Sequence, residues 1–187
     1  MATSANVSAG KPAVAGAIYV APLGTTLPTD ATTALAAGYK SLGYISDDGV
    51  TFGQKPESET IKAWGGDPVL TLVTGRTFTA QFTMLEAKNI DVLKMVYGEA
   101  NVSGSLSSGI TVKGNAKALE GHVIVIDTLL TNNTAQRYVF PEAYVTDVAD
   151  VALKDNDAIG YQVTITGTPG SDGDSQKIFT KAATGSL

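Results

Sequence analysis

The chain has 187 residues, which is enough for one domain with a sizeable core and short for two. Charged residues make up 17% of it, below the roughly 25% of typical soluble proteins, and the net charge is −5. The absence of cysteine excludes disulfides, thiolate metal sites and a cysteine nucleophile. The surplus of carboxylates argues against a protein that grips nucleic acid, because such proteins neutralise phosphates with lysine and arginine.

No apolar run approaches the ~18 residues of a membrane span, and the N-terminus lacks a cationic start followed by an apolar stretch. We therefore expect neither a membrane partner nor a secretory signal. Glycine is abundant, at 20 residues, and valine, isoleucine and threonine recur in short runs. This composition is typical of strands and turns and predicts an all-β, mostly antiparallel sandwich or partial barrel with one flanking helix.

The first half of the chain begins with an arm over residues 1–15, which lacks any period and is either loose or ordered by a partner. A loop over 24–38 follows the first strand, and Asp47, Asp48 and Gly49 form a turn signal. Lys55 and Pro56 open a break between two further strands. The expected strands are 16–23, 39–46, 50–54, 59–64, 69–73 and 78–85, the last with the clearest alternation.

One helix is expected next, with Asn89 as its N-cap and Gly98 at its end. Residues 99–109 are predicted to be a flexible Gly/Ser loop, and the apolar run 123–126 a strand buried on both faces. Pro141 is expected to interrupt a strand, and residues 167–187 to form a flexible C-terminal arm after a domain spanning 16–166. The other expected strands are 110–113, 119–130, 137–140, 143–148 and 161–166.

The residues of catalysis and metal binding are sparse. His122 has no recognisable nucleophile near it in the sequence, so we interpret it as a packing or surface residue. Residues 154–160 (KDNDAIG) resemble a calcium loop, but Ile159 stands where an oxygen ligand is needed and no bidentate glutamate follows. We predict a turn with solvated carboxylates there, no cofactor, no metal ion and no enzymatic activity.

Trp64, the single tryptophan, lies in a segment that ends in two glycines, outside the main core pattern. It is either a core residue or an anchor in an interface with another chain, since a buried tryptophan is a common interface hot spot.

The order of these segments resembles the tail tube type of the phage major tail protein family, from long-tailed phages. The resemblance is carried by residues 43–50 (GYISDDGV), 59–69 (ETIKAWGGDPV), the strand 78–85, the helix with Gly98, and residues 145–151 leading into 157–166 (DAIGYQVTIT). These stretches span residues 40 to 170.

The resemblance implies a structural virion protein with a two-sheet sandwich, assembled in the host cytoplasm into hexameric rings that stack as a hollow tail tube. DNA would pass through the lumen without specific binding, and the tape measure, tail tip and terminator proteins would be the partners. A long loop over about 47–69 would reach the adjacent ring. The candidate interface residues on this loop are Asp47, Asp48, Ile61, Lys62 and Trp64.

Two other classes of protein remain as alternatives. A carbohydrate-binding or adhesin-type β-sandwich would need exposed aromatic side chains on a flat face or a convincing calcium loop. An enzyme on a β scaffold would need a pair of carboxylates or another catalytic set, and no spacing in the sequence singles one out.

Overall fold

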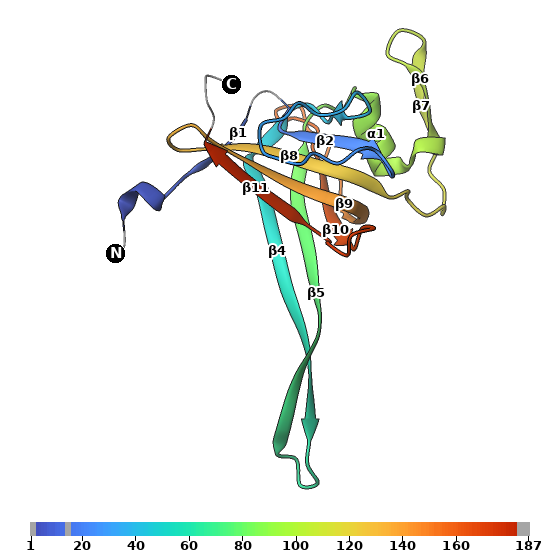
Figure 1. Ribbon diagram of the computed structural model, residues 1–187. Coiled ribbons are helices and arrows are strands. Elements are labelled where there is room, and N and C mark those ends of the chain that lie inside the picture. Colours follow the sequence, from blue (N-terminus) through green and yellow to red (C-terminus); the bar gives the residue numbers. More distant parts are fainter. Residues whose placement is uncertain (1–2, 14–15, 183–187) are drawn as a thin grey trace.

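The computed structural model describes residues 3–13 and 16–182. Within them the chain forms eleven strands, one α-helix and two short 3-10 helices (Figure 1). In chain order these are η1 Ser4–Asn6, β1 Gly10–Pro12, β2 Ile18–Pro22, β3 Lys40–Ser41, β4 Ile45–Lys62, β5 Pro68–Met84, α1 Ile90–Tyr97, η2 Glu99–Asn101, β6 Val102–Ser105, β7 Gly109–Val112, β8 His122–Leu130, β9 Thr134–Val148, β10 Tyr161–Thr168 and β11 Lys177–Ala182.

Nine of the strands form one antiparallel sheet, which confirms the predicted fold class. Its hydrogen-bonded order is β3-β2-β8-β9-β10-β5-β4, with β1 paired to β8 and β11 paired to β9, while β6 and β7 form a separate hairpin. The sheet curves over on itself: Phe52 on β4 stacks on Tyr138 of β9, with ring centroids 4.1 Å apart, although two strands separate β4 from β9 in the sheet. The resulting shape is a partial barrel, built from one continuous sheet.

The core lies inside this curve and is closed by the helix. Alternate residues of β5 point inward, so that Ala80 and Phe82 are buried while Gln81 between them is exposed. Helix α1 has the predicted N-cap, because the Asn89 side chain accepts a hydrogen bond from the Asp91 backbone N–H, and its C-cap is Gly98. The predicted run 123–126 is fully buried on β8.

A buried arginine fixes the connection between β2 and β3 to the sheet. The Arg137 guanidinium donates from Nε and Nη2 to the Asp127 carboxylate at 2.6 and 2.8 Å. Its Nη1 donates to the backbone carbonyls of Asp30 and Thr33 at 3.1 and 2.7 Å. Because both partners of this ion pair are largely buried, each depends on the other to offset the cost of desolvation.

Two expected interruptions of strands are wrong. Strand β9 runs through the buried Pro141, at a point where its pairing with β8 shifts register between His122 and Ile124. Proline is tolerated at such a bulge, where no regular ladder hydrogen bond is needed. Likewise, the segment 55–58 does not break a strand, because β4 continues through it as a single element. Pro56 is accommodated on β4, which lies at the edge of the sheet.

Other sequence expectations also differ from the structure. The predicted loop 99–109 contains η2 and most of the β6–β7 hairpin. The predicted strand 39–46 is divided between β3 and the start of β4, with the buried Leu42 and the exposed Tyr44 in the connection.

The two terminal segments that were predicted to lie outside the domain also contain structure. The one expected over 167–187 contributes β11 to the sheet, and residues 183–187 lie outside the described residues. The one expected over 1–15 supplies η1 and β1, and its residues 1–2 and 14–15 likewise lie outside the described part. Along the described chain, no helix has both the length and the apolar character that crossing a membrane requires.

Candidate interaction site

The longest feature of the molecule is a hairpin that leaves the body of the protein. Strands β4 and β5 pair along their whole length, from Ile45 opposite Met84 to Lys62 opposite Pro68. Every residue from 54 to 74 is exposed, so this part of the hairpin has no core beneath it. We call residues 54–74 the arm; Figure 1 shows it projecting far from the curved sheet.

The arm keeps its shape through its own local chemistry. The turn at its tip is closed by hydrogen bonds from the Ala63 N–H to the Asp67 carbonyl at 2.8 Å and from the Gly66 N–H to the Ala63 carbonyl at 2.9 Å. Gly65 and Gly66 have φ of 115° and 100°, which favour glycine strongly. Cross-strand side chains add to the pairing, with the Thr77 hydroxyl donating to the Glu57 carboxylate at 2.7 Å.

The surface of the arm is apolar to an unusual degree for a segment surrounded by solvent. Trp64 in the turn is fully exposed, and the large apolar residues along the two strands are all close to half exposed or more. Ile61 lies opposite Leu70, and Leu72 is two residues further along β5, so these three share one face. The exposed apolar residues of the arm are Ile61, Trp64, Val69, Leu70, Leu72 and Val73. Exposed apolar side chains gathered on one hairpin in this way are typical of sites of interaction with another chain.

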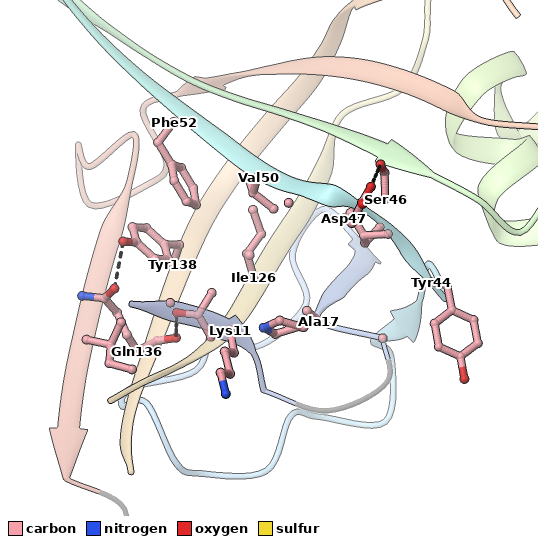
Figure 2. A pocket seen from close by; sticks show the side chains of 17 residues that line it. Lys11, Ala17, Tyr44, Ser46, Asp47, Val50, Phe52, Ile126, Gln136 and Tyr138 are labelled. Carbon is pink, nitrogen blue, oxygen red and sulfur yellow. Dashed lines mark hydrogen bonds between the residues drawn. The ribbon is translucent and has the colours of Figure 1, made fainter. Parts of the chain in front are cut away.

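A groove lies at the opposite end of β4, where the hairpin joins the body. It has a volume of about 680 Å³ and is lined by residues of β1, β4, β8 and β9. Figure 2 shows Phe52 and Val50 of β4 facing Tyr138 and Ile126 across it. Lys11 and Asp47, both exposed, lie among its lining residues. We call this cavity the root groove.

The structure separates the five predicted interface residues into two groups. Asp47 and Asp48 lie at the root of β4, in a bulge where the pairing with β5 shifts register between Ile45 and Val50. Ile61, Lys62 and Trp64 lie at the tip of the arm. With a rise of about 3.3 Å per residue, roughly 40 Å of strand separates the groups. They therefore cannot form one contact surface within a single chain.

The full exposure of Trp64 decides between its two interpretations within this chain: it is not a core residue. Sequence reasoning missed the apolar residues of the returning strand, Val69, Leu70, Leu72 and Val73, and the root groove. The four apolar residues carried a signal in the sequence, since an apolar run next to a Gly-Gly-Asp-Pro turn is unusual for a solvated hairpin. The root groove carried no such signal, because it depends on the curvature of the sheet.

His122 lies in a second cavity, of about 550 Å³, next to ion pairs that join Lys40 to Asp91 and Lys94 to Glu99. Burial lowers the pKa of the His122 imidazole, although the nearby Glu120 acts in the opposite direction. The imidazole is therefore neutral at pH 7. Among the described residues, no group of three histidine or carboxylate side chains could hold a metal ion.

The two features that a carbohydrate-binding or adhesin-type module would need are not assembled within residues 3–13 and 16–182. Tyr44 and Trp64 are the exposed aromatic residues of the described chain, and they lie at opposite ends of β4, so they form no flat platform. In the loop that resembles a calcium site, Asp157 lies 3.8 Å from the Lys154 ammonium and both side chains are exposed.

Within the described residues, the outer side of β4 pairs with no strand and the apolar hairpin lies in solvent. Partner chains commonly complete subunits of this kind. The comparison with protein families specifies which kind. A family model for phage tail tube proteins matches residues 3–182, and the chain belongs to this family. Membership points to a structural, non-enzymatic component of the virion tail. A search of curated proteins found no match.

Proposed function

We propose that the chain is the major tail tube subunit of a long-tailed phage. Its copies form hexameric rings, and the rings stack into a hollow tube through which DNA passes during ejection. The tape measure, tail tip and terminator proteins are its partners, and assembly takes place in the host cytoplasm. The observation that carries this proposal is the arm, an apolar hairpin that the described part of its own chain leaves uncovered, found in a member of the tail tube family.

The energetics of the arm favour burial against another copy. A two-stranded hairpin without a hydrophobic layer beneath it is marginally stable in water. Burying its exposed apolar side chains against a neighbouring ring would supply that layer, and the hairpin is long enough to leave the body of its own subunit (Figure 1). The arm therefore fits the role of the segment that joins one ring to the next.

The sheet also has an edge that a neighbour within the ring can complete. Strand β4 is the last strand of the sheet, so along its outer side the described chain provides no partner. Pairing of this edge with a strand of the adjacent subunit would satisfy its backbone groups and protect the protein from unspecific aggregation. A net charge of −5 supports an interior that repels phosphate, so that DNA moves through without dwelling.

Electron microscopy of the purified protein tests the proposal. Negatively stained samples at rising concentration, with and without tail tip complexes as initiators, are expected to show six-fold rings and tubes with a stain-filled lumen. Particles that remain monomeric at high concentration, even with initiators present, would contradict it.

A further inference from the structure

The tip of the arm presents a compact group of side chains that has no partner among the residues that the structure describes. Trp64 is fully exposed, and the hydrogen bonds of the turn around it hold the backbone in one conformation. Lys62 and Asp67 flank it, and neither takes part in an ion pair within residues 3–13 and 16–182. A large side chain on an ordered turn loses little conformational entropy on binding, which suits it to be an anchor.

The root groove has complementary properties. Its floor is formed by apolar and aromatic side chains, with Phe52 stacked on Tyr138, and the Tyr138 hydroxyl is already satisfied by Gln136 at 2.9 Å. Its volume of about 680 Å³ lies within the roughly 300–1,000 Å³ of pockets that bind drug-sized molecules, so it has room for an indole. Lys11 and Asp47 supply one charge of each sign, and no ion pair of the described chain involves either.

The two features cannot meet within one molecule. The groove lies where β4 begins and the tip lies beyond its end, at the other extreme of the hairpin (Figures 1 and 2). A surface and a complementary pocket at different places on one chain form a head-to-tail contact, and repetition of that contact builds an open stack rather than a closed dimer. Subunits stacked along the direction of the arm would bring the tip of one copy to the root of the next.

We propose that the root groove receives the tip of the arm from a second copy in the adjacent ring. Trp64 packs on the floor formed by Phe52 and Tyr138, while Lys62 and Asp67 of the tip face the opposite charges of Asp47 and Lys11 on the receiving copy. This inference rests on the proposed function and specifies the receiving site for the arm.

Cysteine cross-linking tests the inference cleanly because the chain contains no cysteine of its own. The test pair is Ala63→Cys, next to Trp64 in the turn, with Gly10→Cys, an exposed residue that lines the groove and carries no charge of the proposed contact. The matched control pair keeps Ala63→Cys and adds Lys117→Cys, an exposed lysine on the connection between β7 and β8 that does not line the groove. The three substituted positions leave Trp64 in place, so the anchor is intact in both pairs.

Filaments of each pair are treated with a short bismaleimide cross-linker and run on a denaturing gel. We expect the test pair to convert the monomer band into a ladder, because each chain carries both halves of the link. Each single-cysteine variant can give at most a dimer, and the control pair is expected to give no ladder. As a second measurement, Trp64→Ala should lose filaments while the circular dichroism spectrum of the monomer is unchanged, and Trp64→Phe should recover part of the assembly.

The outcomes separate the inference from the proposed function. Filaments of normal appearance with no ladder from the test pair, or with an equal ladder from the control pair, would overturn the groove as the receiving site and leave the tube intact. A wild-type protein that forms no filaments under any condition would overturn the proposed function and this inference with it.

Discussion

The apolar face of the arm permits a quantitative prediction about assembly. Ile61, Leu70 and Leu72 share this face and are 46%, 50% and 46% exposed in the single chain. Full burial of such a side chain contributes about 1.5–3 kcal/mol, so covering the exposed half contributes roughly 1 kcal/mol each and about 3 kcal/mol for the three. We expect the triple variant with serine at these positions to lose most of this free energy of association.

The critical concentration for filament formation measures this loss. Since 1.4 kcal/mol corresponds to a tenfold change, about 3 kcal/mol predicts a critical concentration raised on the order of 100-fold. Sedimentation of filaments over a range of total protein concentrations gives this value. The folded monomer should be little affected, because substitution of exposed residues usually changes the free energy of unfolding by about 0.5 kcal/mol or less each.

A matched control uses leucines that are exposed elsewhere. Leu106, between β6 and β7, and Leu153, between β9 and β10, are more exposed than the leucines of the arm. Their double serine variant should assemble at the wild-type concentration. If the triple variant assembled as readily as the control, or if it lost its cooperative unfolding transition, the arm would not be acting as an assembly surface.

Two further predictions concern the body of the protein. Arg137→Met leaves the largely buried Asp127 carboxylate without its partner and should lower the free energy of unfolding, measured by urea denaturation, by about 3–5 kcal/mol. The double variant Arg137→Met/Asp127→Leu should recover most of this loss, because it also removes the unpaired charge. Equal losses in the two variants would contradict the ion-pair argument. Because burial lowers the pKa of His122, the unfolded state takes up its proton first, so stability should fall as pH drops below the ordinary histidine value of 6.5. The variant His122→Asn should weaken the dependence of the urea midpoint on pH between pH 7.5 and 5.5. An unaltered pH dependence would show that His122 does not cause the loss of stability.

Elements with a strong local pattern could be predicted from the sequence. Helix α1 is specified by its cap at Asn89, its apolar stripe and its terminal Gly98, all within ten residues of one another. Strand β8 is specified by an apolar run that suits a strand buried on both faces, and residues 123–126 are buried there. In these segments the local signal and the tertiary environment agree, which is why the predictions hold.

The arm could be predicted as a region but not as a structure. Lys55 and Pro56 suggested a break because proline usually ends a strand, yet an edge strand that pairs on one side only can accommodate it. Strand β11 was missed because its short β-forming segment, Lys177–Ala182, stands alone between polar stretches. The root groove depends on the contact between Phe52 and Tyr138, which are 86 positions apart in the sequence and are brought together by the curvature of the whole sheet.

A helical reconstruction of the assembled filament tests the central claim most directly, because it shows where the arm of each subunit lies. The account predicts that residues 54–74 of one ring are buried against the next ring and that the density of Trp64 packs against the stacked rings of Phe52 and Tyr138 of the receiving subunit. Arms that point freely into solvent, or that fold back onto their own subunit while the rings still stack, would contradict it.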